Sequence, residues 1–424
     1  MTASRDAAPF LWGAATSSFQ VEGAPGADWA AWDPLAGARP GMTGHYARFR
    51  EDIGLLRELG LNAYRFSVEW SRIQPEADRW DDAVLAHYGE LAEAVRAAGA
   101  EPLVTLHHFS SPAWLHAAAP WTEAEAAGRF AAFAGRVADA LPAVRSWITF
   151  NEPMVLLLGG FLDGCMPPGL RSVGAFLSAL RTLLAAHAAA AAAVRLSNPA
   201  ALVGVAHNMA VFAPDRPWHP LDRLLARVAR QGYNRALLEA MTAGSTRLTL
   251  PFARPVTVAG PARDTLDFIG VNYYQRLHVR HRLGAGQLGC VEVRHRDRCG
   301  LGLTDMGWEE HPPGLAVVLR EAAAFGLPLL VTENGIATED GERKSEFIRR
   351  HVAVLESCRR AGIDVRGYFY WSLTDTYEWL HGFGRRFGLY RVDWETLERS
   401  PTAAARVYAR LVRESGGRAG LITS

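Results

Sequence analysis

Short apolar runs recur along the chain and alternate with longer segments whose hydrophobic residues are spaced three or four positions apart. In residues 48–60, RFREDIGLLRELG, this spacing places Ile53, Leu56 and Leu59 on one face, and Gly60 supplies a C-terminal stop, so we expect a helix. Residues 80–100 show the same pattern. The apolar runs predict eight β-strands, at Leu11–Ala15, Asn62–Phe66, Pro102–Leu106, Trp147–Phe150, Leu202–Ala206, Phe268–Val271, Leu329–Val331 and Tyr368–Trp371.

This alternation of strands and helices predicts an α/β fold, namely a (β/α)8 barrel in a single domain covering residues 1–424, with loop insertions at its C-terminal face. An open, doubly wound sheet would give the same alternation. Nucleotide-binding versions of that sheet lose support, because no G-x-G-x-x-G follows the first strand and no G-x-x-x-x-G-K-[ST] occurs in the chain.

Polar or aromatic residues stand at the end of every predicted strand. One polar loop is weak evidence, but in a barrel all eight strand ends meet at one rim, where this fold builds its active sites. We therefore expect a crowded polar and aromatic pocket there. In strand order the residues are Gln20 and Glu22, Arg65, His107 and His108, Asn151 and Glu152, His207 and Asn208, Asn272 and Tyr274, Glu333 and Asn334, and finally Trp371, Glu378 and Trp379.

Composition and charge restrict the partners. Hydrophobic residues make up 49% and charged residues 21% of the chain, as in a globular protein with a large core. The formal net charge of +1 gives no general electrostatic basis for binding nucleic acid or an anionic membrane. No block of like charges indicates a disordered interaction tail. A small-molecule substrate is the expected partner.

The cysteines and the N-terminus bear on the compartment. Cys165, Cys290, Cys299 and Cys358 form no C-x-x-C pair, which argues against a zinc knuckle or redox motif. Cys290 and Cys299 share one predicted loop and could pair, but free thiols in a reducing compartment are favoured. The N-terminal sequence lacks the features of a signal peptide, and the longest apolar helix, Leu183–Val194, is too short to cross a bilayer. We expect a cytoplasmic protein.

Two glutamates follow apolar strands in similar strings, Glu152 in WITFNEP and Glu333 in LLVTENG. If the barrel brings them to one pocket, they can share the cleavage of a glycosidic bond, one as a protonated acid and the other as an ionised carboxylate. Arg65 is a natural partner for the ionised member, because a guanidinium lowers the pKa of a nearby carboxyl. Tyr274 could donate a hydrogen bond to the same carboxylate, and Asn151 could bind a substrate hydroxyl.

Taken singly, each of these residues has a structural interpretation. A lone Glu at a strand end is more often a cap or surface acid, and a lone Arg or His an ion pair or core residue. A metal site from His107, His108 and His207 has weak support, because adjacent histidines on a strand point to opposite faces. Sugars, however, need aromatic rings for their CH faces and polar partners for their hydroxyls. The string YEWLHGFGRRFG supplies both, although Trp12, Trp70, Trp371 and Trp379 would individually be core residues.

Together these strings resemble glycoside hydrolase family 1, the β-glucosidase-type enzymes. The resemblance runs from FLWGAATSSFQVEGA near the start to RFGLYRVDWETLERSPTAAARVYARLV near the end. Between them stand NAYRFSVEWSRIQP, PLVTLHHFSSPAWL, WITFNEP, DFIGVNYY, TDMGWEEHPPGL, LVTENG and GYFYWSLTDTYEW. The resemblance implies a (β/α)8 barrel and a retaining double displacement that uses neither a metal nor an organic cofactor.

The resemblance also implies roles for individual residues. Glu152 of the N-E-P string would be the acid/base, and Glu333 of the T-E-N-G string the nucleophile. The sugar hydroxyls would be held by Gln20, His108, Asn151, Glu378 and Trp379, with Trp371 as the platform beneath the ring. Arg65, Asn272 and Tyr274 would surround the nucleophile and the 2-hydroxyl, and Trp308 would flank the aglycone.

One choice within the family has a physical argument. Members that act on 6-phosphorylated sugars need cationic and hydroxyl groups near the 6-position, where an acid would repel the phosphate. Glu378, followed by Trp379, stands at that position here, so an unphosphorylated glycoside is favoured. Arg385 and Arg386 are interpreted as parts of a structural loop.

Departures from the family pattern concern the leaving-group side. Phe109 and Ser110 replace the usual Trp-Asp, and Met154 replaces a Trp, which would put it on the leaving-group side. The shortened stretch 23–45 should open the pocket mouth, and the basic, glycine-rich residues 281–300 should border the aglycone site. These changes leave the preferred aglycone open, but they do not affect the residues expected to carry out the cleavage.

The leading hypothesis is a retaining β-glycosidase acting on β-D-glucosides and tolerant of β-galactosides or β-fucosides. A transglycosylating β-glycosidase would use the same residues. A catalytically silent sugar-binding barrel is disfavoured, because such proteins typically lose one of the two glutamates. The sequence leaves the oligomeric state open, a homo-oligomer included.

Overall fold

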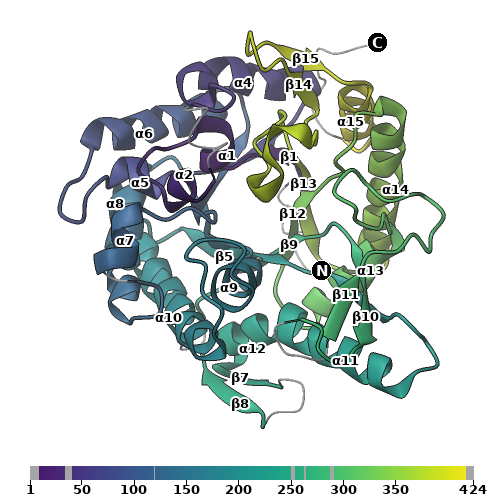
Figure 1. The fold of residues 1–424 in the computed structure, drawn as a ribbon. Helices are drawn as coiled ribbons and strands as arrows, with labels where there is room; N and C mark the ends of the chain where they lie inside the picture. Colours follow the sequence, from purple (N-terminus) through teal and green to yellow (C-terminus); the bar gives the residue numbers. More distant parts are fainter. Residues whose placement is uncertain are drawn as a thin grey trace, which may run out of the picture.

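Eight parallel strands close into a barrel in the order β1-β13-β12-β9-β5-β4-β3-β2 (Figure 1). A computed structural model describes residues 9–33, 41–118, 120–249, 254–261, 264–286 and 291–416. The closed ring confirms the predicted (β/α)8 class over the open sheet. The barrel strands are β1 (Leu11–Ala15), β2 (Ala63–Ser67), β3 (Glu101–His107), β4 (Ser146–Asn151), β5 (Leu202–Asn208), β9 (Phe268–Asn272), β12 (Leu329–Asn334) and β13 (Val365–Trp371).

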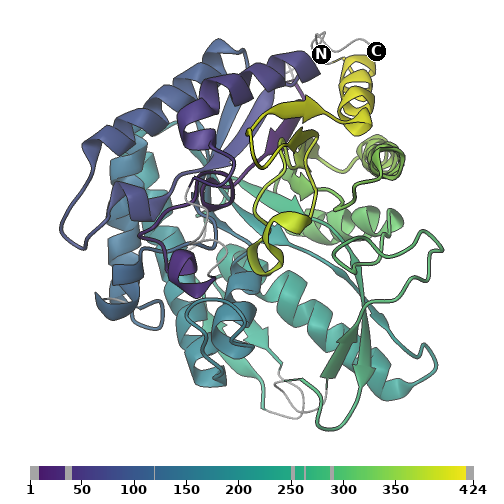
Figure 2. The same cartoon turned by 45° about the horizontal axis from the view of Figure 1, so that its top comes forward.

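Helices surround the barrel and short elements cover one end of it (Figures 1 and 2). The longer outer helices are α4 (His45–Leu59), α6 (Asp82–Ala97), α8 (Glu125–Ala140), α10 (Val173–Ser197), α12 (Ala236–Ala243), α13 (Pro313–Ala323), α14 (Gly341–Arg360) and α15 (Ala403–Glu414). Shorter helical segments are α1 (Ser18–Glu22), α2 (Asp28–Trp32), α5 (Trp70–Ile73), α7 (Ala113–Ala118), α9 (Pro153–Leu157), α11 (Pro220–Arg230), the π-helical turns η1 (Leu158–Leu162) and η2 (Gln231–Arg235), and the 3-10 segment η3 (Trp379–Gly384).

The eight predicted strands all occur, with small shifts at their ends. β1 has the predicted bounds, whereas β13 begins at Val365 and β12 continues through Glu333 and Asn334. Polar residues at the rim are thus held inside the hydrogen-bonded barrel. Three small sheets lie outside it, made of β6 (Val211–Pro214), β10 (Arg276–His281) and β11 (Val291–Arg294), of β7 (Ser245–Leu248) and β8 (Val256–Ala259), and of β14 (Tyr390–Val392) and β15 (Arg399–Pro401).

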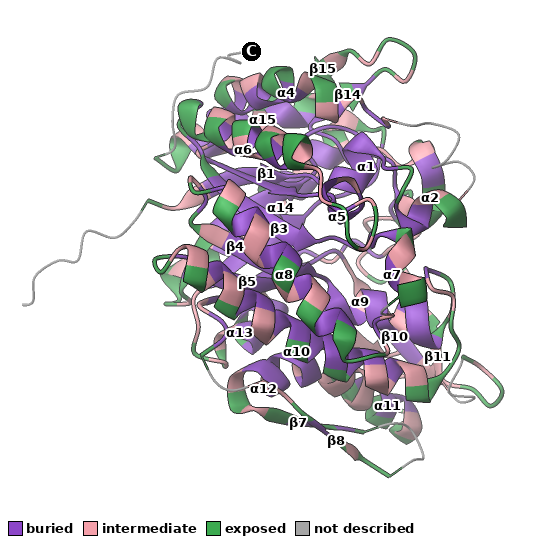
Figure 3. Cartoon of the chain, turned by 90° about the vertical axis from the view of Figure 1, so that its left-hand side faces the viewer, coloured by how far each residue is buried: buried purple, intermediate pink, exposed green. Residues whose placement is uncertain are grey.

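The barrel strands are mostly buried (Figure 3). Each contributes at least one apolar side chain to a cluster inside the barrel, which is separate from the core under the helices. Two of them are large rings that need glycines opposite them. A Cβ on Gly204 would lie 2.5 Å from the Phe268 ring, and a Cβ on Gly13 would lie 2.4 Å from the Phe369 ring. The eight residues are Ala15, Ala63, Leu103, Ile148, Ala206, Phe268, Leu330 and Phe369.

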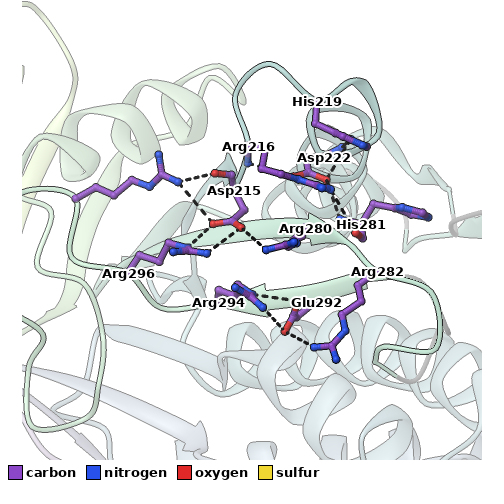
Figure 4. A network of polar contacts seen from close by, with 11 residues as sticks. Asp215, Arg216, His219, Asp222, Arg280, His281, Arg282, Glu292, Arg294 and Arg296 are labelled. Carbon is purple, nitrogen blue, oxygen red and sulfur yellow. Dashed lines mark hydrogen bonds and ion pairs between the residues drawn. The ribbon is translucent and has the colours of Figure 1, made fainter.

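Ion pairs between arginines and carboxylates lie in and around the β6-β10-β11 sheet and in the loop that joins β6 to α11 (Figure 4). The buried carboxylates of Asp215 and Asp222 and the partly buried carboxylate of Glu292 each have at least one arginine partner. These arginines are thus paired with acids and stabilise the outer sheet. The pairs include Arg216 with Asp222, Arg296 and Arg280 with Asp215, and Arg282 and Arg294 with Glu292.

Helix α10 is longer than predicted. It covers 25 residues and, by length and composition, is long and apolar enough to cross a membrane, so the length argument built on Leu183–Val194 is wrong. Ser172 caps the helix by accepting a hydrogen bond from the Ala175 N–H, so the helix starts well before its apolar stretch. The helix packs against α8, and 56% of its apolar window is buried, as in a core helix.

The close approach of Phe268 to Gly204 predicts that Gly204→Ala is destabilising. The added methyl meets the ring inside a filled barrel, so the free energy of unfolding should fall by about 1–3 kcal/mol. Gly54→Ala in α4 is the matched control, because nothing lies within 4 Å of its Cβ position. It should gain about 0.5–1 kcal/mol. Urea denaturation compares the two, and equal stabilities would contradict the packing argument.

Candidate active site

A cavity of about 280 Å³ lies at the C-terminal ends of the barrel strands. Most residues singled out from the sequence line it, namely Gln20, His108, Asn151, Glu152, Tyr274, Trp308, Glu333, Trp371, Glu378 and Trp379. Arg65 and Asn272 do not line the cavity but hydrogen-bond to residues that do. The strand-end pattern therefore located the pocket.

Glu152 sits directly after β4, where the backbone turns. Its φ of 44° is in the left-handed region, and Pro153 then opens α9 with a φ suited to the first helical position. The Glu152 N–H still donates to the Ala206 carbonyl of β5 at 2.7 Å, so the turn begins while the residue remains attached to the barrel. This geometry directs the Glu152 side chain into the cavity.

The Glu152 carboxyl is surrounded by neutral donors. Its Oε1 accepts hydrogen bonds from Asn208 Nδ2 at 2.9 Å and from Asn272 Nδ2 at 2.8 Å. Burial, together with the nearby charge of Glu333, raises the pKa of Glu152 to about 7, although the two amides lower it. Glu152 is thus able to hold a proton near neutral pH.

Glu333, near the end of β12, has charged and phenolic partners instead. Arg65 Nη1 donates to its Oε1 at 2.5 Å and the Tyr274 hydroxyl to its Oε2 at 2.6 Å. Burial raises the pKa of Glu333, and Arg65 and then Tyr274 oppose that rise by stabilising the carboxylate. The partners of Glu333 therefore favour its ionised form.

Arg65 connects the strands beneath the cavity and is only 1% exposed. Besides Glu333, it donates through Nη2 to Asn151 Oδ1 at 2.7 Å and through Nη1 to the Thr332 carbonyl at 3.1 Å. Asn151 Nδ2 in turn lies 3.0 Å from His108 Nε2, and burial lowers the pKa of His108 well below its usual value. His108 is therefore a neutral hydrogen-bonding group.

A third carboxyl, Glu378, faces the same cavity. Its Oε2 accepts from Gln20 Nε2 at 3.2 Å, and Gln20 Nε2 also reaches the Tyr377 carbonyl at 2.7 Å. Burial, and then the charges of Glu333 and Glu152, raise the pKa of Glu378 to about 8. At neutral pH this carboxyl can both donate and accept hydrogen bonds, as a group that binds a sugar hydroxyl must.

Aromatic rings form two walls of the cavity. On one side Trp379 and Trp371 lie near the His108 ring, at centroid distances of 6.2 and 5.8 Å. On the other side the Trp308 ring lies 5.4 Å from Tyr274. The arrangement provides flat apolar faces beside the three carboxyls, which suits a ligand with both CH surfaces and hydroxyls.

Some of the predicted strand-end residues point away from the cavity, contrary to the expectation that all would converge. Glu22 accepts from the Tyr88 hydroxyl at 2.7 Å, and Asn334 donates to the Tyr273 carbonyl at 2.6 Å. His107 lies 3.0 Å from Ser111 Oγ, and His207 lies 2.9 Å from the Tyr233 carbonyl. Strand pleating separates His107 from His108. No group of three metal-ligating side chains occurs among the described residues.

Comparison with known proteins decides the family. The model of glycosyl hydrolase family 1 matches residues 5–417. The chain belongs to glycosyl hydrolase family 1. This confirms the resemblance read from the sequence and makes the protein a glycoside hydrolase.

Relatives of this family 1 enzyme carry names from two substrate classes. It is similar to beta-glucosidase A of Thermotoga maritima, 32% identical over 96% of this chain and 97% of that protein. It is 29% identical to a 6-phospho-beta-galactosidase of Streptococcus equi subsp. zooepidemicus over 95% of this chain and 97% of that one. A solved beta-glycosidase from Pyrococcus horikoshii superposes with a TM-score of 0.89 at 38% sequence identity. The match covers 96% of this chain and 94% of that one.

Two expectations about the leaving-group side of the family 1 enzyme are not met. Met154 is buried and lines a separate apolar cavity, whereas its neighbour Val155 lines the active-site cavity. None of the described residues in 281–300 lines the active-site cavity, because β10 and β11 pair into the outer sheet. The expected wider mouth depends on residues 34–40, and the Cys290–Cys299 pairing on Cys290, all outside the described residues.

The structure also shows where Phe109 and Ser110, the other departures from the family pattern, and Arg386 lie. Phe109, with a φ of 66°, packs edge-on against Trp379 at 5.2 Å and lines the cavity. Ser110 donates to the buried Glu69 carboxyl at 2.9 Å, outside the cavity. Arg386 pairs with Asp375 at 2.7 Å, as expected of a structural loop.

Sequence reasoning missed several residues of the site. Asn208 was noted only as a strand-end residue, although it donates to Glu152. Tyr233 and Phe387 both line the cavity and come from a π-helical turn and a loop. The strand-end pattern carries no signal for such residues, because it follows only the barrel strands.

Proposed function

We propose that this family 1 enzyme is a retaining β-glycosidase that hydrolyses unphosphorylated β-D-glucosides, and also β-galactosides or β-fucosides. The observation that carries the proposal is the unequal pairing of two carboxyls in one cavity. Glu333 is paired with a guanidinium and a phenol, and Glu152 with two neutral amides. Such a difference separates a nucleophile from an acid/base.

In the first step, the Glu333 carboxylate attacks the anomeric carbon while Glu152 gives its proton to the leaving oxygen. The aglycone departs as an alcohol and the sugar stays as an ester on Glu333. In the second step, Glu152, now ionised, takes a proton from water, and the oxygen of that water displaces Glu333 from the anomeric carbon. Two inversions return the β configuration, and both carboxyls regain their starting states.

Substrate groups would be held by the residues around these two carboxyls. Gln20, Glu378, His108, Asn151 and Trp379 offer donors and acceptors to the hydroxyls, and Trp371 offers a ring face. Asn272 and Tyr274, which hydrogen-bond to Glu152 and Glu333, would bind the 2-hydroxyl, and Trp308, which lines the cavity, would flank the leaving group.

An unphosphorylated sugar is favoured by the side chains that line the cavity. No lysine or arginine is among the described residues that line it, and Glu378 adds a carboxyl. Arg386, near in sequence, pairs with Asp375 and lines a different cavity. A phosphate dianion would therefore be desolvated without a compensating cation.

The first test removes each carboxyl in turn. Glu333→Gln should lower kcat for an aryl β-glucoside by about 10⁴-fold or more, because the covalent intermediate cannot form. Glu333→Gly with added azide should give the α-glucosyl azide, since azide then attacks from the vacated face. Nuclear magnetic resonance of the product identifies the anomer. Full activity of Glu333→Gln, or an α-configured sugar as the first wild-type hydrolysis product, would reject the mechanism.

The second test is the pH dependence of kcat/KM, which reports groups of the free enzyme. Glu152 must be protonated in the first step, so activity should fall as pH rises through its pKa of about 7. Glu333 must be ionised, so activity should fall on the acid side as pH drops through a pKa above the usual glutamate value. Glu152→Gln should remove the alkaline limb when an activated aryl glucoside is the substrate. An alkaline limb that persists in this variant would assign it to another group.

The third test compares substrates. The kcat/KM for a 4-nitrophenyl β-glucoside should exceed that for its 6-phosphate by at least about 100-fold, because burying the phosphate beside Glu378 lacks a cationic partner. Above pH 8, where Glu378 is ionised, Glu378→Ser should narrow this ratio by removing the repulsion between this carboxylate and the phosphate. A 6-phosphate that reacts faster with the wild type would place the enzyme with the phosphoglycosidases.

A further inference from the structure

The two oxygens of the Glu152 carboxyl have different surroundings. Within the described part of the chain, both hydrogen bonds to this carboxyl reach Oε1, from Asn208 Nδ2 at 2.9 Å and Asn272 Nδ2 at 2.8 Å. An oxygen that accepts two N–H donors cannot also direct an acidic proton at either of them. The proton of a neutral Glu152 therefore belongs on Oε2.

This selection depends on how each amide is oriented, because an asparagine turned over would present Oδ1 instead of Nδ2. A hydroxyl fixes each of them. The Tyr233 hydroxyl donates to Asn208 Oδ1 at 2.9 Å, and Thr332 Oγ1 donates to Asn272 Oδ1 at 2.6 Å. Each hydroxyl thus stabilises the orientation in which the amide N–H faces Glu152.

We propose that Tyr233 and Thr332 are positioning residues for the acid/base chemistry, acting through Asn208 and Asn272 to keep the transferable proton of Glu152 on Oε2. This inference rests on the proposed function of Glu152. Neither hydroxyl hydrogen-bonds Glu152 itself; each fixes the amide that does. In both chains the donors run from the hydroxyl to the amide oxygen and from the amide N–H to Oε1, and the two amides are paired neighbours on β5 and β9.

The Asn272 side chain is fully used in this arrangement. Its Nδ2 donates one hydrogen to Glu152 and the other to Asn151 Oδ1 at 3.0 Å, while its Oδ1 accepts from Thr332. Among the described residues, the Asn208 side chain hydrogen-bonds only to Glu152 and Tyr233, so its orientation depends on Tyr233. Loss of the Tyr233 hydroxyl should therefore have the larger effect.

Tyr233 is held in place by the local fold. It belongs to the π-helical turn η2 between α11 and α12, and it lines both the active-site cavity and the apolar cavity that contains Met154. Its ring packs 5.5 Å from Phe212 on that apolar side. The ring thus has an apolar environment, while the hydroxyl reaches Asn208, and π-helical turns are frequent at functional sites.

The charged and titratable groups facing Glu152 do not select an oxygen in this way. Arg65 is paired with Glu333. The other titratable groups among the described residues that line the cavity with Glu152 are the carboxyls Glu333 and Glu378, the phenols Tyr233 and Tyr274, and the histidines His108 and His381, whose pKa values burial lowers. Their long-range fields act on the carboxyl as a whole. Only the two amides contact one oxygen specifically.

The test is the alkaline limb of kcat/KM in Tyr233→Phe and Thr332→Val. Without its hydroxyl donor, the amide can turn over and put Oδ1 against Oε1, an arrangement that requires a proton on Oε1. The protonated form of Glu152 is then favoured, so the limb should move up by about one pH unit in Tyr233→Phe and less in Thr332→Val. A limb that stays in place or moves to lower pH in Tyr233→Phe would overturn the proposal.

A second readout concerns the leaving group. A proton held on Oε1 is not delivered to the substrate, so kcat/KM of Tyr233→Phe for a methyl β-glucoside should fall by about tenfold at pH 6. For 2,4-dinitrophenyl β-glucoside, whose leaving group needs no proton, it should stay within about twofold. Equal losses with both substrates would indicate general damage to the site and would reject the positioning role.

Tyr408→Phe is the matched control. Tyr408 is buried in α15, and its hydroxyl donates to the Gly13 carbonyl at 2.7 Å, outside the cavity. Tyr408→Phe removes a buried hydroxyl, as Tyr233→Phe does, so its free energy of unfolding should fall by a comparable amount. The alkaline limb of its kcat/KM profile should stay at the wild-type pH. Thermal unfolding of both variants checks that each remains folded at the assay temperature.

Failure of this inference can be told apart from failure of the proposed function. The pKa of Glu152 can be read without turnover from the ¹³C carboxyl resonance that disappears in Glu152→Gln, and it should rise by about one unit in Tyr233→Phe. If Glu152→Gln keeps full activity on a methyl β-glucoside, the proposed function is wrong whatever Tyr233 does. If Glu152→Gln is inactive on it but the resonance titrates unchanged in Tyr233→Phe, only the positioning role is wrong.

Discussion

The site depends on one buried guanidinium, that of Arg65, beside a cavity that holds three carboxyls. Arg65 is paired at 2.5 Å with Glu333, whereas the hydrogen-bond partners of Glu152 and Glu378 among the described residues are neutral. Burying a second or third carboxylate beside the first costs far more than burying one that has a guanidinium partner. The pKa values of about 7 for Glu152 and about 8 for Glu378 express this cost. The position of Arg65 on β2 thus decides which carboxyl carries the charge.

Barrel register makes this arrangement rigid. Asn272 on β9 pairs with Asn208 on β5 and with Glu333 on β12, so three polar side chains share one row at the rim. Asn272 then reaches across to Glu152, which follows β4. Since neighbouring strands are fixed by the ladder, the distances in this row do not depend on loops. The loops supply the outer walls, where family relatives with different substrates can diverge.

The sequence was sufficient for the barrel and for most of the cavity, because strand ends in this fold share one rim. It failed where side-chain direction mattered. His107 and Met154 were assigned to the site region, but strand pleating and the helical turn of α9 direct them elsewhere, and His108 and Val155 line the cavity instead. Tyr233 could not have been found by the same reasoning, because a π-helical turn between α11 and α12 has no strand-end pattern.

Neutral amides rather than a cation beside Glu152 suit the role proposed for it, first as an acid and then as a base. A cation would hold Glu152 ionised and remove its proton before the first step. In the free enzyme the charge of Glu333 helps to keep that proton in place. In the proposed mechanism the charge disappears when Glu333 becomes esterified, so the pKa of Glu152 falls just as it must become a base. The two N–H donors on Oε1 then stabilise the carboxylate, without having prevented its earlier protonation.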